Sequence, residues 1–251
     1  MPETVVPIPD RVAIRELSVS AYTVPTDLPE SDGTLAWDAT TIVLVHAQAA
    51  GQTGLGYTYA DVATAKLIAQ TLIPLVRGRN AMDIPGCWSA MRHGIRNLGR
   101  PGICSMAMAA VDVALWDLKA KLLGVPLVTL LGAAQPGVPV YGSGGFTSYS
   151  IPQLQAQLAG WVASGMAAVK MKIGRDPGHD LERVAAARAA IGPQAALYVD
   201  ANGAYSRQQA LRMAERFAAL EVSWFEEPVT SDDLEGLRLL RDRAPAGMDI
   251  A

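Results

Sequence analysis

The second half of the chain alternates between short apolar segments and longer amphipathic ones. The apolar segments have the length and composition of buried strands and fall at residues 138–141, 168–173, 196–199, 222–225 and from Met248 onward. The amphipathic segments have helical spacing and fall at residues 151–164, 180–191, 206–220 and 231–242. Strict alternation of this kind predicts a parallel sheet with right-handed crossovers. Four strand-helix units and the start of a fifth correspond to the first half of a (β/α) barrel, which needs eight.

The first part of the chain has a different rhythm. Strands are expected at residues 11–20, 40–47 and 57–59, and the Pro- and Gly-containing stretch 25–33 is expected to be a loop. Helices are expected at residues 61–76, 84–98 and 105–123. Ser105 is the expected N-cap of the last helix, and Gly124 with Pro126 marks its end. The fold class is therefore α/β: an α+β domain at residues 1–132, followed by a partial barrel domain at 133–251.

Composition and charge narrow the functional classes. Half of the 251 residues are hydrophobic, the net charge is −3, and the Lys and Arg residues are scattered, so nucleic acid is not an expected partner. Cys87 and Cys104 have neither metal-ligand nor disulfide-framework spacing, and the N-terminus does not have the pattern of a signal peptide. No stretch is apolar enough for a membrane span. A cytoplasmic protein with reduced thiols and no membrane contact is expected.

Three polar motifs follow successive expected strands, each about one strand-helix unit after the last. They are Lys170-Met171-Lys172, Asp200-Ala201-Asn202 and Glu226-Glu227-Pro228. Consecutive parallel strands end at the same rim, which is where α/β barrels place their chemistry. We therefore expect these side chains to lie together.

The two lysines suggest a base. Alternate residues of a strand share a face, so Lys170 and Lys172 point the same way. A solvated edge strand would explain an isolated Lys-x-Lys pair, because lysine is rarely buried without a partner. In a barrel interior, mutual repulsion, desolvation and a nearby cation would lower a lysine pKa enough to allow proton abstraction near pH 7. Lys172, nearer the rim, is the better candidate, with Lys170 as its tuning neighbour.

The two carboxylates suggest a metal. Asp200 and Glu226 each end an apolar strand, where an unpaired carboxylate is costly. A helix N-cap for Asp200 and a salt bridge for Glu226 are the structural alternatives. Oxygen ligands of this type suit Mg²⁺, which retains positions for water and substrate. Asn202 is a candidate for binding substrate or a metal-bound water.

The ordered set of motifs resembles the enolase superfamily, specifically the mandelate racemase and muconate lactonizing enzyme group. The segments 110–126 and 130–132 add to the resemblance, which covers essentially the whole chain. It implies a capping domain over a modified barrel, Mg²⁺ as cofactor, and removal of the proton next to a substrate carboxylate to form an enediolate. By resemblance, Lys172 is the base, Lys170 its partner, and Asp200 and Glu226 the metal ligands. Glu227 is the less favoured ligand of its pair.

The resemblance also sets the expected function. A lyase or isomerase is implied, most simply a sugar-acid dehydratase, with racemase, epimerase and cycloisomerase chemistry as alternatives, and a homo-oligomer is expected. The family's third ligand would fall just past Ala251, so the chain is expected to be a fragment of a longer protein or a non-catalytic remnant. The glycines at 142–145 are interpreted as a barrel loop rather than a phosphate-binding loop, because the Lys-Ser/Thr of a P-loop does not follow them.

Overall fold

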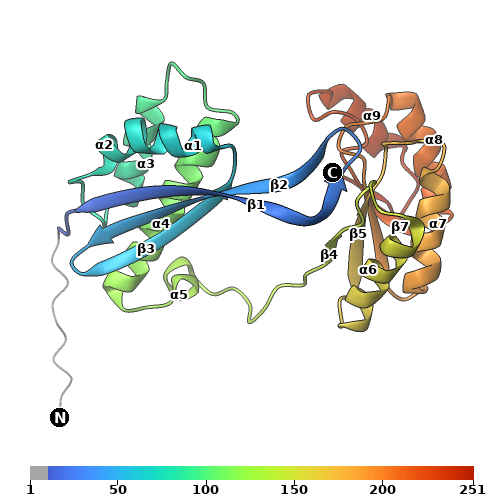
Figure 1. Cartoon of the computed structure of the whole chain (residues 1–251), viewed down its shortest axis with the longest axis horizontal. Helices are drawn as coiled ribbons and strands as arrows, with labels where there is room; N and C mark the ends of the chain where they lie inside the picture. Colours follow the sequence, from blue (N-terminus) through green and yellow to red (C-terminus); the bar gives the residue numbers. More distant parts are fainter. Residues whose placement is uncertain (1–10) are drawn as a thin grey trace, which may run out of the picture. The chain divides into compact units, whose positions relative to one another are not determined.

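The computed structural model describes residues 11–251, which form two compact units (Figure 1). The first unit contains residues up to 25 and residues 39–136, and the second contains residues 26–38 and 137–251. The segment 26–38 thus belongs to the second unit although it occurs early in the sequence. Among the described residues, none of the helices combines the length and apolar character needed to cross a bilayer.

An antiparallel sheet begins the chain. Its strands are β1 (Glu16–Ser31), β2 (Ala36–Ala49) and β3 (Gln52–Tyr59), in the order β1-β2-β3. The expected loop at 25–33 is wrong, because β1 continues to Ser31. Pro25 and Pro29 are compatible with this strand because β1 lies at the edge of the sheet, where a missing N–H removes no ladder bond on the outer side.

Helices follow the sheet in the first unit. They are α1 (Val62–Leu67), the π-helical turn η1 (Ile68–Leu72), α2 (Ile73–Val76), α3 (Ile84–Gly94), α4 (Ile103–Leu123) and α5 (Leu127–Leu131). The expected helix at 61–76 is thus one helical run with a π turn inside it. Gly124 ends α4 in the left-handed conformation, as predicted. Ser105 is not the N-cap, because α4 starts two residues earlier and the Ser105 hydroxyl donates to the carbonyl of Arg100.

Helix α4 packs against β3 at unusually close range. A Cβ at Gly54 would lie 2.1 Å from the carbonyl oxygen of Ala114, and one at Gly56 would lie 2.0 Å from that of Ala110. Figure 1 shows α4 running along the sheet. The small residues on both elements therefore let backbone approach backbone, and the core of this unit forms around that contact.

The second unit is built on a parallel sheet. Its strands are β4 (Gly142–Gly144), β5 (Ala168–Lys172), β6 (Ala196–Asp200), β7 (Val222–Glu226) and β8 (Asp249–Ile250), in sequence order across the sheet. The helices between them are α6 (Ile151–Ala163), α7 (Asp180–Ile191), α8 (Arg207–Ala218) and α9 (Leu234–Arg243), with α7 and α8 side by side in Figure 1. Consecutive parallel strands with intervening helices are the arrangement expected for this part of a (β/α) barrel.

The first strand of the parallel sheet differs from the prediction. Residues 138–141 are not a strand, and three of the four residues at 142–145, which were expected to form a loop, are β4 itself. A Cβ at Gly142 would lie 2.4 Å from the ring of Trp161, and one at Gly144 would lie 2.8 Å from the same ring. The Trp161 side chain on α6 therefore occupies the space where side chains of this strand would be, which explains why glycine replaces the usual β-branched residues.

The early segment 26–38 packs within the second unit. The hydroxyls of Ser31 and Thr147 are hydrogen-bonded at 2.6 Å, and the Ser148 hydroxyl donates to the carbonyl of Pro29. A Cβ at Gly33 would lie 2.2 Å from the carbonyl oxygen of Ala201. The turn between β1 and β2 therefore contacts the backbone just after β6 directly.

Candidate active site

Three strand ends place the predicted residues in one layer. Lys172, Asp200 and Glu226 are register partners across β5, β6 and β7. Two residues earlier on each strand, Lys170 is the partner of Tyr198, and Tyr198 that of Trp224. Because alternate strand residues share a face, all of these side chains lie on one side of the sheet.

The lysines and carboxylates form a compact charged cluster. Lys172 Nζ lies 2.6 Å from Asp200 Oδ2, and Lys170 Nζ lies 2.7 Å from both carboxylate oxygens of Glu226. Lys170 Nζ is also 3.4 Å from Asp200 Oδ2. The side chain of Asp200 is 1% exposed and that of Lys170 7%, whereas Lys172 is 16% and Glu226 28% exposed. Lys172 and Glu226 are thus the members most accessible to a ligand.

The charges of this cluster perturb its titration. Burial opposes the charge on Lys170, but the hydrogen bonds that its ammonium group donates to Glu226 and the nearby Asp200 carboxylate outweigh burial, so the pKa of Lys170 is raised. Burial likewise opposes the charge on Glu226, yet hydrogen bonds from Lys170 and Trp224 hold its pKa below the usual value. The pKa of Lys170, the expected tuning neighbour of the base, is thus raised because its carboxylate partners stabilise the ammonium form.

The structure places Asn202 beside the charged cluster. Its backbone N–H donates to Asp200 Oδ1 at 3.0 Å, and its φ of 49° lies in the left-handed region, which Asn tolerates. Its side-chain oxygen Oδ1 is buried and makes no hydrogen bond within the described chain. This acceptor is free to bind a further donor or cation. Glu227 also has a positive φ, and its N–H donates to the carbonyl of Ala251.

Aromatic side chains that were not predicted from the sequence as part of the site support the cluster. Trp224 Nε1 donates to Glu226 Oε2 at 3.1 Å, and Lys170 Nζ lies 5.5 Å from the centroid of the Tyr141 ring. Tyr198 packs against both rings. The alternation of side chains along a strand could have identified two of these residues. Tyr198 and Trp224 stand two residues before Asp200 and Glu226 and therefore share their face of the sheet.

The donor set of this layer is suited to a hard cation. Asp200 and Glu226 offer carboxylate oxygens from adjacent strands, and Asn202 offers an amide oxygen without a partner. Within residues 11–251, no cluster of three or more His, Cys, Asp or Glu side chains has a geometry that could hold a metal ion. Asp200 and Glu226 are two neighbouring carboxylates, one fewer than such a cluster requires.

Comparison with known proteins assigns the chain to a family. Residues 15–132 match the mandelate racemase / muconate lactonizing enzyme N-terminal domain, and residues 153–251 match the enolase C-terminal domain-like family. The chain belongs to the enolase superfamily, in the mandelate racemase and muconate lactonizing enzyme group. The predicted fold class is thereby confirmed, with an antiparallel α+β part followed by parallel strand-helix units.

Solved and curated members of the superfamily indicate the chemistry to consider. A mandelate racemase/muconate lactonizing enzyme-like protein from Rubrobacter xylanophilus is 56% identical, with a TM-score of 0.93 over 95% of this chain and 67% of that one. The 3,6-anhydro-alpha-L-galactonate cycloisomerase of Streptomyces coelicolor is 36% identical over 87% of this chain and 62% of its own length. The L-talarate/galactarate dehydratase of Salmonella typhimurium, solved with Mg and L-lyxarohydroxamate, is 27% identical, with a TM-score of 0.87 over 96% of this chain and 65% of that one.

The chain spans 62% of the length of the Streptomyces coelicolor cycloisomerase. The dehydratase is a lyase and the cycloisomerase is an isomerase. The predicted enzyme class, a lyase or isomerase of the enolase superfamily, agrees with these relatives.

Proposed function

We propose that this chain carries the proton-abstracting half of a Mg²⁺-dependent active site that removes the α-proton of a sugar acid, as the first step of dehydration. The observation that carries the proposal is the contact of Lys172 Nζ with Asp200 Oδ2 at 2.6 Å, beside Lys170 and Glu226 at adjacent strand ends. A lysine base beside a Mg²⁺ site is the general pattern of enolase superfamily chemistry. The dehydratase and cycloisomerase relatives support a sugar acid as the substrate class.

Asp200 and Glu226 are the residues that we propose as ligands of the cation. Both are carboxylates on neighbouring strands, and the unpartnered Oδ1 of Asn202 is an additional oxygen next to them. When bound, Mg²⁺ would supply positive charge that stabilises the enediolate form of the substrate carboxylate. The solved dehydratase with bound Mg supports this choice of cation.

The lysines divide the remaining work in this proposal. Lys172 is the more exposed of the two and takes the α-proton on Nζ. Lys170, held between Glu226 and Asp200 with a raised pKa, keeps its proton and fixes the position of the Glu226 carboxylate. Asn202 positions the substrate or a water at the edge of the same layer.

The base assignment is testable by isotope exchange. Lys172→Met should abolish exchange of the α-proton of galactarate, or of another accepted sugar acid, with deuterated solvent, because no amine would remain at that position to take the proton. The exchange is measured by NMR, with Lys66→Met, an exposed lysine of α1, as the matched control. Undiminished exchange in Lys172→Met would refute the assignment.

Binding of Mg²⁺ tests the proposed ligands separately from the base. It also tests the alternative that the chain is a non-catalytic remnant. Calorimetric titration of the chain with Mg²⁺ should give one-site binding that is weakened at least tenfold in Asp200→Asn and in Glu226→Gln. Glu215→Gln on α8 is the control, because this carboxylate is exposed. Binding that is absent, or equal in all four proteins, would favour the remnant.

Cycloisomerisation is the second candidate function. It is favoured by the cycloisomerase relative, which is 36% identical. Both reactions begin with removal of an α-proton, so they differ in the product rather than in the lysine. Mass spectrometry separates them: a dehydratase product has lost one water, whereas a cycloisomerase product has the mass of its substrate.

A further inference from the structure

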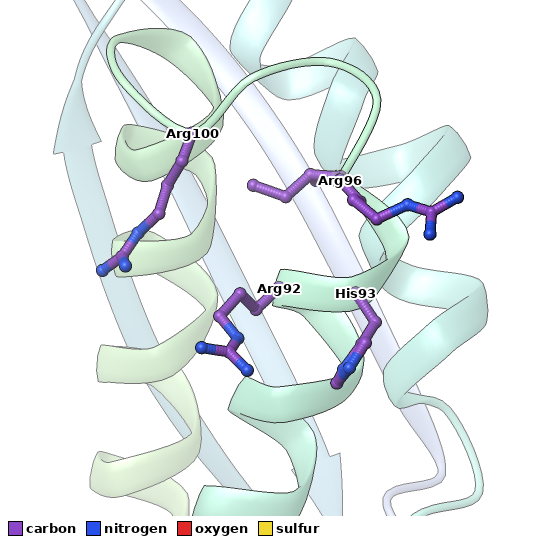
Figure 2. A pocket seen from close by; sticks show the side chains of 5 residues that line it. Arg92, His93, Arg96 and Arg100 are labelled. Atoms are coloured by element: carbon purple, nitrogen blue, oxygen red, sulfur yellow. The ribbon is translucent and has the colours of Figure 1, made fainter.

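A pocket in the first unit is lined mainly by arginine side chains. It has a volume of about 330 Å³, and its lining residues are Arg92, His93, Ile95, Arg96 and Arg100. Figure 2 shows the guanidinium groups of Arg92 and Arg100 toward the left of the view, and the imidazole ring of His93 and the guanidinium group of Arg96 to the right of them. Ile95 is buried and contributes the apolar floor.

Within residues 11–251, the arginines of this pocket have no carboxylate partners. The ion pairs of the described chain are made by lysines, by His179 and by other arginines, and none includes Arg92, Arg96 or Arg100. His93 uses Nδ1 locally, at 2.7 Å from the carbonyl of Ser89. Arg92 and His93 lie in the last turn of α3, where the helix dipole favours positive charge, but Arg96 and Arg100 lie beyond that helix. The dipole therefore does not account for the whole cluster.

One arginine is held in place before any ligand arrives. The Arg100 guanidinium stacks over the Trp88 ring of α3, with Cζ 5.8 Å from the ring centroid. Stacking on an aromatic face leaves the edge of the guanidinium free to donate hydrogen bonds. An arginine positioned in this way loses less conformational freedom when an anion binds, which favours recognition.

We propose that this pocket binds a small phosphate-bearing anion, gripped chiefly by Arg92 and Arg100. Guanidinium groups match phosphate oxygens with paired hydrogen bonds, and several uncompensated positive charges around one hollow favour a ligand with more than one negative charge. The volume falls in the range of small-molecule sites. All lining residues belong to the first unit, so the site is independent of the lysines and carboxylates on the parallel sheet.

Calorimetric titration with pyrophosphate, without Mg²⁺ and at physiological salt, tests the proposal. Saturable one-to-one binding is expected, weakened at least tenfold in Arg92→Gln and in Arg100→Gln. Arg100→Lys should also weaken binding, because lysine keeps the charge but not the paired hydrogen bonds. Arg15→Gln is the matched control, since Arg15 is exposed in the same unit and outside the pocket.

The same titrations define the contrary outcomes. The proposal is overturned if pyrophosphate does not bind the unaltered chain, or if Arg15→Gln weakens binding as much as the pocket variants. Equal affinity for citrate, which is also multiply charged but has only carboxylates, would overturn the phosphate assignment. Lys172→Met should bind pyrophosphate unchanged, and loss of binding there would place the anion at the other site. Circular dichroism of each exposed-residue variant checks that it folds.

Discussion

At the scale of single residues, the Glu226 carboxylate is held by Lys170 on one side and by Trp224 on the other. We expect Trp224→Phe to destabilise the chain by about 1 kcal/mol, because the carboxylate loses one donor in a half-buried site. The pKa of Glu226 should rise at the same time, since the indole N–H stabilises its charged form. Urea unfolding at neutral pH measures the free energy of unfolding.

A double-mutant cycle separates this contact from general packing. In a Glu226→Gln background, Trp224→Phe should cost clearly less than in the unaltered chain, because the charged acceptor is already gone. Equal costs in the two backgrounds would mean that the indole stabilises the protein by packing alone.

The sequence was sufficient to predict the positions of the charged residues, but not the contacts that each charged group makes. Strand alternation and the spacing of the motifs were sufficient to place Lys172, Asp200 and Glu226 in one layer, with Lys170 on the same face of the sheet. The pKa direction of Lys170 was not predictable, because it depends on which carboxylate the ammonium group contacts. Trp224 was missed because an aromatic residue in a strand is normally interpreted as core.

At the scale of elements, the close contact of β3 with α4 makes Gly56 a sensitive position. Gly56→Ala should destabilise the chain by about 1–3 kcal/mol, since its Cβ would lie 2.0 Å from the Ala110 carbonyl oxygen and the helix would have to move. Gly160→Ala is the matched comparison, because Gly160 lies in α6 with open space around it. That change should stabilise by about 0.5–1 kcal/mol. In thermal unfolding, the midpoint temperature of Gly56→Ala should lie below that of the unaltered chain, and the midpoint temperature of Gly160→Ala should lie above it.

A second link between these elements is pH-dependent. Asp117 on α4 accepts from the backbone N–H of Leu55 on β3 and pairs with Lys121, both contacts being 2.7–2.8 Å long. Burial opposes the charge on Asp117, but these two contacts outweigh burial, and they hold the pKa of Asp117 below its usual value. A carboxylate with a depressed folded pKa stabilises the fold above its unfolded pKa, and this contribution is lost as the pH falls through the folded value.

Asp117→Asn should therefore cost about 0.5–1 kcal/mol at pH 7, and this difference should shrink as the pH falls below about 3.8. Urea unfolding at a series of pH values measures the difference between the two proteins. Glu215→Gln, an exposed change on α8, should show no comparable pH dependence. A cost for Asp117→Asn that is constant with pH would contradict the ionic origin of this link.

The two misplaced elements have a common physical cause. Residues 138–141 have the composition of a strand, and 142–145 that of a loop, yet the strand is Gly142–Gly144 because Trp161 fills the side-chain space. The prolines at 25–33 suggested a loop, yet they lie in an edge strand. In both cases the outcome depends on a neighbouring element, the helix α6 for β4 and the strand β2 for β1, which local propensity does not register.

At the scale of the whole molecule, exposed apolar residues favour association. Val138 is 75% exposed and Val140 is 67% exposed, and both precede β4 at the edge of the parallel sheet. Neighbouring apolar side chains and an unpaired strand edge favour contact with another chain. We expect light scattering to report a mass above the 26.5 kDa of one chain. A monodisperse monomer across a wide concentration range would contradict this expectation.

The packing of residues 26–38 within the second unit also has a consequence during protein synthesis. The hydrogen bond between the hydroxyls of Ser31 and Thr147 can form only after Thr147 has been synthesised, 116 residues later. At typical rates of translation this interval lasts roughly 6 to 23 seconds. Throughout that time the turn between β1 and β2 has been synthesised, but the residues of the second unit that it contacts, such as Thr147 and Ser148, have not. Residues 26–38 are thus synthesised long before the rest of the second unit, residues 137–251, and they cannot take up their native contacts until those residues have been added.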